Sequence, residues 1–290
     1  MKTKTYFLAA AIVAATSLPG NAGQKVCKAP VPVESEDIWV HPITAPYWNE
    51  DSFITTDIRP VFAHHTFPGS IFGGGHANVY AAQVRVKLLP NLQLVATKDG
   101  YMDINLKGYK NDGWNDLSAG LKYAFLQDDV NKLYSAIGLS YEFASGDDEV
   151  LQDDDEIRLW WSINKGIGRL HLGATANYFF ATDNGDDPFG DSNHFSWHLH
   201  ADYQINKWIS PVVEVNGYHV FDEGDVVTPF QGNDVLNLGG NKNENTITAA
   251  IGLEVRPCSR FALRAAYERA INNDRDLFGH RWTFSSVIEF

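Results

Sequence analysis

The feature that most constrains this chain is an alternation of apolar and polar residues that starts near residue 53 and continues to the last residue. In one segment, Leu117 and Phe125 share one face, whereas Ser118 and Lys122 share the other. A period of two residues is typical of β-strands with one apolar and one polar face. The pattern predicts about twelve strands, over residues 54–65, 77–88, 91–99, 114–126, 132–144, 155–165, 169–181, 193–205, 208–220, 245–256, 260–271 and 280–290.

The connections between these segments alternate in length. The short ones are 89–90, 127–131, 165–168, 206–207 and 257–259, and the long ones are 68–75, 100–113, 145–154, 182–192 and 221–243. Bacterial outer-membrane barrels have an even number of strands, short periplasmic turns and long outer loops. A soluble sandwich also alternates, but apolar faces without charges favour a barrel. The predicted fold class is all-β: a transmembrane antiparallel up-and-down β-barrel with a short irregular N-terminal periplasmic segment.

The first residues have the features of a secretory signal peptide. Lys2 and Lys4 precede an apolar stretch over residues 6–15, and Ala22 is a small residue that suits cleavage. The apolar stretch is shorter than the ~20 residues of a spanning helix. We therefore expect residues 1–22 to be a signal peptide.

Prolines and acidic residues dominate the segment that follows. Proline fixes φ and removes a backbone donor, so residues 23–52 should be extended and irregular. Trp39 and Trp48 indicate that this segment packs against another surface. We interpret residues 23–52 as a Pro-rich periplasmic lead-in and residues 53–290 as the barrel.

The last predicted strand ends in an aromatic residue. Such a terminal residue on an alternating strand resembles the signal by which bacterial outer-membrane barrels are recognised for insertion. The residues that would form this signal share one face, and they are Trp282, Phe284, Ile288 and Phe290.

Two stretches resemble elements of one exported barrel family. They are GWNDLSAGLKYAF, residues 113–125, and RPCSRFALR, residues 256–264. The chain is similar in these stretches to the outer-membrane family labelled "MetA-pathway of phenol degradation". The resemblance implies an outer-membrane protein and a channel for small, often apolar, molecules. The family label names a pathway, so it implies little about the solute.

Charged and imidazole side chains lie on the polar faces of the predicted strands. Such residues are tolerated inside a barrel if the lumen is wet or if they pair across strands. They could line a polar pore or form a salt-bridged interior that holds a narrow barrel shut. The predicted lumen-lining residues are Arg85, Lys122, Arg158, Arg169, His198, His200, Asp202, Glu214, Glu254, Arg256, Arg264, Glu268 and Arg281.

A group of histidines suggests a metal site as one hypothesis. His198 and His200 share a face, and a tight turn would place Glu214 and Asn216 roughly opposite them, with His171 on the preceding strand. Imidazoles beside a carboxylate can bind zinc or relay protons. A slip of one residue in register would undo this set. We favour ordinary lumen lining and predict no metal site.

An enzyme is a further alternative. Outer-membrane phospholipases use a His and a Ser two residues apart on a strand, and His194 and Ser196 have that spacing. Their predicted direction is inward, whereas an enzyme that acts on lipid needs them on the outer wall. We therefore predict no catalytic residues and no enzyme.

Two cysteines are present in the chain, Cys27 and Cys258. The first lies in the predicted lead-in and the second in a predicted periplasmic turn, so both would lie on the same, oxidising side of the membrane. We predict a disulfide between them.

We interpret the protein as a channel or uptake pore for small, possibly apolar or aromatic, molecules in the bacterial outer membrane, with both termini periplasmic. The alternative is a non-conducting structural barrel whose acidic outer loops bind divalent cations or lipopolysaccharide. A net charge of −13 disfavours nucleic acid as a partner. The expected partners are outer-membrane lipid, lipopolysaccharide, the barrel-assembly machinery and a small-molecule solute, and no cofactor is expected. The solute, the oligomeric state and whether residues 23–52 plug the barrel stay open.

Overall fold

The computed structural model describes residues 38–70, 73–150, 155–182, 192–224, 240, 242, 245–272 and 277–290. The predicted signal peptide, Cys27 and part of the predicted acidic outer loops lie outside this part of the chain. The strands are β1 (Asp57–Phe67), β2 (Gly75–Leu89), β3 (Leu92–Lys98), β4 (Tyr101–Leu106), β5 (Tyr109–Trp114), β6 (Leu117–Asp128), β7 (Leu133–Phe143), β8 (Asp155–Ile167), β9 (Leu170–Thr182), β10 (Asn193–Tyr203), β11 (Ile209–Asp222), β12 (Asn245–Cys258), β13 (Phe261–Ala270) and β14 (His280–Glu289).

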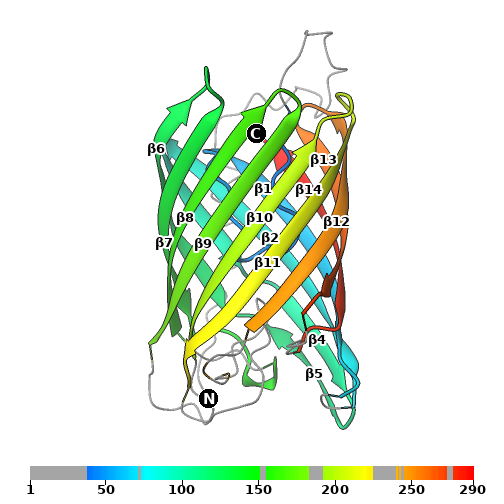
Figure 1. Ribbon diagram of the computed structural model, residues 1–290. Coiled ribbons are helices and arrows are strands. Elements are labelled where there is room, and N and C mark those ends of the chain that lie inside the picture. The colour runs from blue at the N-terminus through cyan, green and yellow to red at the C-terminus, as the bar shows by residue number, and fades with distance from the viewer. Residues whose placement is uncertain are drawn as a thin grey trace, which may run out of the picture.

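These strands form one antiparallel sheet that closes on itself as a barrel (Figure 1). Closure occurs at β1, which pairs with β14 on one side and with β2 on the other. The wall has twelve strand positions. Both β3 and β4 pair with β2, one after the other along its length, and they share one position. The next position is shared by β6, which pairs with β3, and β5, which pairs with β4. The predicted barrel with about twelve strands is confirmed.

One predicted loop is a β-hairpin. Residues 100–113 were expected to connect two strands without structure, but most of them form β4 and β5, which continue the wall at its lower end in Figure 1. The 15 residues of β2 are long enough to pair with both β3 and β4. Gly108 has a φ of +90°, which a non-glycine residue adopts only with strain, and it allows the tight turn of the hairpin.

The two faces of the wall differ in chemistry. Large apolar side chains point outward and are about half exposed, such as Leu139 (56%), Trp161 (46%) and Ile251 (68%). Charged and polar side chains point inward and are buried, such as Arg85 (1%) and Glu268 (0%). An apolar outer band around a polar interior is the pattern of outer-membrane barrels. The described residues contain no helix long and apolar enough to cross a membrane.

The segment before β1 lies inside the barrel (Figure 1). We call residues 38–56 the plug. Residues 38–52 of the predicted lead-in are therefore in the barrel interior, and residues 23–37 lie outside the described part of the chain. An irregular backbone cannot pair its own N–H and C=O groups as a helix or a sheet does. The polar side chains of the lumen supply the donors and acceptors that these groups need.

Candidate functional site

The candidate site is the lumen, which the plug fills. Every plug residue from 40 to 52 is buried except Pro46, which is half-buried. The plug folds back at Ala45, which has a φ of +47° and whose carbonyl accepts hydrogen bonds from the amides of Trp48 and Asn49 at 2.9 and 2.8 Å. A residue before proline is disfavoured from the right-handed helical region, so Pro46 contributes to this unusual conformation.

A carboxylate of the plug meets a basic part of the wall. Glu50 accepts hydrogen bonds from Arg85 Nε at 3.0 Å and Nη2 at 2.5 Å, and from Lys122 Nζ at 2.8 Å. The neighbouring Asp51 accepts a hydrogen bond from the amide of Phe53 and lies 3.5 Å from Lys122 Nζ. These contacts fix the end of the plug that leads into β1.

The ionisation of this carboxylate is set by opposing effects. Burial favours the neutral acid, but Arg85 and Lys122 outweigh it and lower the pKa of Glu50 to about 2. Burial is likewise outweighed at Asp51, whose pKa is held well below its ordinary value by Lys122 and His41. Both carboxylates are therefore charged at neutral pH, as paired buried groups.

The opposite end of the plug meets an acidic part of the wall. Glu214 on β11 accepts hydrogen bonds from the amides of Ile43 at 2.9 Å and Thr44 at 2.7 Å, and from the Thr44 hydroxyl. Asp202 on β10 accepts from the amide of Val40 at 3.4 Å. The plug thus offers acceptors to cations at one end and donors to carboxylates at the other.

Two arginines also bind the plug backbone. Arg158 on β8 donates to the carbonyl oxygens of residues 47–48 at 2.7 Å each. Arg264 on β13 donates to the carbonyl oxygens of residues 41–42 at 3.2 Å each. A buried carbonyl without a donor is costly, so these guanidinium groups stabilise the plug in the lumen.

Aromatic contacts complete the packing. Trp39 stacks on His171 of β9, with ring centroids 4.2 Å apart and an interplanar angle of 20°. Trp48 packs against Phe179 at 4.5 Å and His194 at 4.8 Å. Such pairs bury a large apolar area against the plug.

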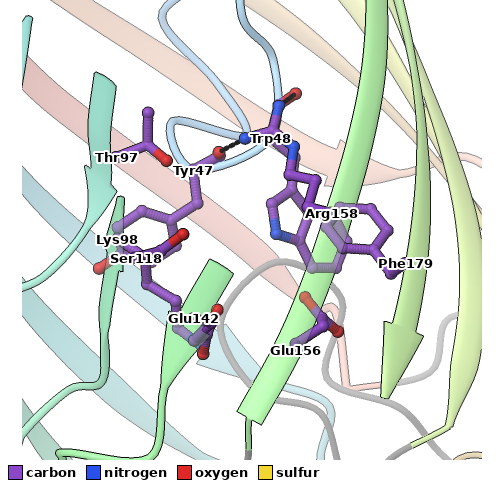
Figure 2. Close-up of a pocket in the computed structure, with 9 residues that line it drawn as sticks. All are labelled: Tyr47, Trp48, Thr97, Lys98, Ser118, Glu142, Glu156, Arg158 and Phe179. Carbon is purple, nitrogen blue, oxygen red and sulfur yellow. Dashed lines mark hydrogen bonds and ion pairs between the residues drawn. The ribbon is translucent and has the colours of Figure 1, made fainter. Parts of the chain in front are cut away.

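A small cavity adjoins the plug. One cavity of about 10 Å³, close to the room that one water molecule needs, lies between the plug and β3, β6, β7, β8 and β9. Its lining includes the partly buried ion pair of Lys98 and Glu142. Figure 2 shows its nine lining residues: Tyr47, Trp48, Thr97, Lys98, Ser118, Glu142, Glu156, Arg158 and Phe179.

The structure buries every predicted lumen-lining residue except Arg169. Arg169 is exposed in the turn between β8 and β9, where its guanidinium donates to the carbonyl of Ile205 at 3.3 Å. Its prediction as a lumen residue is wrong because β9 begins one residue later than the alternation indicated. The wall also pairs charges within itself, as Arg59 with Asp57, Arg256 with Glu254, and Arg281 with Glu268.

The predicted register of the histidine group is confirmed. His200 pairs with Glu214 and His198 with Asn216 across β10 and β11. His200 bridges Glu214 at 2.7 Å and Asp202 at 3.2 Å, and His171 contacts the other oxygen of Asp202 at 2.8 Å. Within the described ranges, no group of three or more His, Cys, Asp or Glu side chains is placed to hold a metal ion.

The residues considered for lipid hydrolysis face the lumen. Ser196 lies 2.9 Å from His198 Nε2, and His198 Nδ1 lies 2.8 Å from Asn216 Oδ1, so the imidazole near Ser196 is not that of His194. Ser196 is fully buried, and β10 pairs with strands on both sides, which engages its backbone amides. A nucleophile for lipid needs access from outside and donors for an oxyanion. Ser196 has no such access from the outer face, because its side chain is fully buried.

The remaining predicted residues fall as follows. Trp282, Phe284 and Phe290 are exposed on the outer face of the last strand and its end, with Ile288 partly exposed between them. Cys258 is buried and disulfide-bonded. Its predicted partner Cys27 lies outside the described residues, so that pairing stays a prediction.

The functional residues that sequence reasoning missed belong to the plug. Glu50, Asp51 and Thr44 carry most of its polar side-chain contacts, and they stand in a proline-rich stretch without periodicity. The signal in the sequence was a set of aromatic residues, Trp39, Tyr47 and Trp48, in an otherwise irregular exported segment.

Comparison with solved structures supports the fold. The chain is similar to the COG4313 outer membrane channel from Pseudomonas putida F1, with a TM-score of 0.63 and 11% identity over 84% of this chain and 98% of that one. It is also similar to the NanC porin, with a TM-score of 0.51 and 14% identity over 81% of this chain and 100% of that one. No family model and no curated protein matches the chain, so the resemblance to the phenol-degradation family stays a prediction.

Proposed function

We propose that this protein is a channel for small molecules in the bacterial outer membrane and that residues 38–56 hold the channel closed. The observation that carries the proposal is the nature of the contacts between plug and wall. Most are hydrogen bonds and ion pairs to side chains from many strands, and the plug adds no strand to the sheet. A backbone bond from the amide of Phe290 to the carbonyl of Thr56 lies at the junction with β1. Its removal would leave the backbone pairing of the wall intact.

Three further features support this proposal. The lumen wall is polar and charged, which suits water once the plug has moved. The outer face is apolar, as a lipid-facing surface requires. Two solved structures with a similar fold are described as an outer membrane channel and a porin.

The test is the conductance of the mature, refolded protein in a planar bilayer, compared with its Arg158→Met variant. Arg158→Met removes both donors to the carbonyls of residues 47–48. Loss of hydrogen bonds to a charged donor costs about 1.5–3 kcal/mol. We therefore expect the open fraction to rise about tenfold or more. Arg169→Met is the matched control, because Arg169 lies exposed in a turn, and we expect it to behave like the wild type.

The second candidate function is a structural barrel that never conducts. The filled lumen, with its cavity of about 10 Å³, favours it. This candidate predicts silent bilayers for the wild type and for Arg158→Met, while both proteins keep the heat-modifiable migration of a folded barrel in gel electrophoresis. That outcome would refute the channel.

A further inference from the structure

We propose that Arg85 and Lys122 form a binding site for the carboxylate group of a small solute, and that Glu50 occupies this site as an internal ligand while the plug is in place. The inference rests on the proposed channel function and names the class of solute that it takes. In the open channel, the carboxylate of the solute would take the place of the Glu50 carboxylate beside Arg85 and Lys122.

The first argument is the geometry around the Glu50 carboxylate. Arg85 binds both of its oxygens through two nitrogens, at 3.0 and 2.5 Å, and Lys122 adds a contact at 2.8 Å. A planar guanidinium that contacts two oxygens in parallel recognises carboxylates and phosphates with defined orientation. Because Arg85 is on β2 and Lys122 on β6, the wall supplies both cations and the plug supplies the anion.

The second argument is the balance of charge that remains without the plug. Arg256 and Arg281 have carboxylate partners within the wall, Glu254 and Glu268. In the described part of the wall, the carboxylate nearest to Arg85 is Asp57, at 3.8 Å from Nη1, and Asp57 already binds Arg59 at 2.7 Å. Three cations, Arg59, Arg85 and Lys122, would therefore share one wall carboxylate.

The third argument is burial. The side chain of Arg85 is 1% exposed and that of Lys122 is 0% exposed, so neither charge is solvated by bulk water. While the plug is in place, a buried charge that loses its partner is strongly destabilised, so removal of the Glu50 carboxylate alone would leave Arg85 and Lys122 without compensation. A solute carboxylate that replaced Glu50 would remove this penalty, whereas a neutral solute would not.

Chemical rescue of a full-length Glu50→Ala variant tests the site. The substitution keeps Cβ and removes Cγ together with the carboxylate. The removed group has the size and charge of acetate. We expect Glu50→Ala to lower the melting temperature in detergent micelles, and sodium acetate to shift it back toward the wild-type value in a saturable way. Equal concentrations of neutral acetamide or of sodium chloride should not do so.

The double variant Glu50→Ala/Arg85→Gln is the matched control, and we expect it to lose the acetate response. A response of equal size to acetate, acetamide and chloride would overturn the proposal, as would a response that survives in the double variant. If Glu50→Ala does not fold, the wild type still decides the question. Acetate should compete with Glu50 and raise the open fraction in bilayers above its value in chloride, and equal values would overturn the site.

These outcomes separate the two proposals. Rescue by acetate in a barrel that never conducts would refute the channel and leave the carboxylate site standing. A wild-type channel that opens equally in acetate and chloride, together with a Glu50→Ala variant that acetate does not rescue, would refute the site and leave the channel standing.

Discussion

At the scale of single residues, the plugged lumen depends on polar groups of the plug and the wall that bind one another. Arg158 donates hydrogen bonds to two plug carbonyls and to the side-chain oxygen of Asn177 at 2.9 Å. Each of its three guanidinium nitrogens therefore makes a hydrogen bond. Its guanidinium also lies 4.5 Å from the ring centroid of Trp160, which is 2% exposed. The wall thus positions this arginine through an aromatic ring as well as through hydrogen bonds.

The acid dependence of opening follows from Glu50. Its pKa is about 2 with the plug in place and returns toward the ordinary 4.5 when the plug leaves Arg85 and Lys122. A lowered pKa contributes stability to the closed state above pH 4.5, and this stability is lost as the pH falls toward 2. We expect the same open fraction at pH 7 and pH 5 and a rise below about pH 4.5. Bilayer recordings across this range measure it.

Glu50→Gln is the control for this pH dependence, because glutamine does not titrate. The acid-induced rise should shrink in Glu50→Gln, although the adjacent Asp51 also titrates against Lys122 and His41. An unchanged acid response in this variant would show that other groups govern it.

Gly138 is a residue where a single methyl group should disturb the lumen. A Cβ atom at Gly138 of β7 would lie 2.0 Å from the ring of Trp160, the directly paired residue of β8. We expect Gly138→Ala to destabilise the barrel by about 1–3 kcal/mol through overpacking and to loosen the plug through Arg158. Denaturant unfolding in micelles measures the first effect. Gly69→Ala, where a Cβ meets nothing within 4 Å, should change little.

At the scale of elements, the length of β2 explains why the predicted loop is a hairpin. A strand that continues past the end of β3 leaves its edge unpaired, and β4 covers that edge. Gly100, with a φ of +107°, lies at the break between β3 and β4, so the chain can change direction slightly without losing its partner.

The hairpin should respond locally to a change in its turn. Gly108→Ala forces a residue with a Cβ into a φ of +90°, at a cost of about 1–2 kcal/mol. No neighbour lies within 4 Å of that Cβ, so the effect is backbone strain alone. We expect faster hydrogen exchange in Tyr101–Leu106 and Tyr109–Trp114, with unchanged exchange in β10. Uniformly faster exchange would contradict a local effect.

At the scale of the whole molecule, the barrel and the plug belong to one chain, and contacts such as the one between Ser52 and Ser162 join them. Ser52 of the plug and Ser162 of β8 have hydroxyl oxygens 3.1 Å apart, and both are buried. An S–S bond is about 2.05 Å long, so cysteines at these positions lie close enough to be joined after a small adjustment.

We expect Ser52→Cys/Ser162→Cys to form a disulfide that suppresses channel openings, and a reductant to restore them to the wild-type frequency. The wild type with the same reductant is the control, because it contains the bonded Cys258. A cross-linked protein that opens as often as the reduced one would show that conduction does not require movement of this end of the plug.

Much of the barrel was predictable because strand alternation is a local property. Residues such as Leu121 and Lys122 show their faces without knowledge of their neighbours, and the register between β10 and β11 followed from the short turn that joins them. The first residue of β9 was misplaced, and Arg169 with it, because a tight turn has no alternation of its own.

The site was predictable only as a wall. Arg85, Lys122, Arg158 and Glu214 were identified as inward-facing, but their partners were not, because those partners lie 35 to 171 residues away in an irregular segment. Contacts at such separations leave no periodic trace in a sequence. The chain by itself therefore determined a closed barrel of alternating strands with a polar interior. Only the tertiary structure decided that the interior is filled, since that depends on which buried donors and acceptors the segment before β1 satisfies.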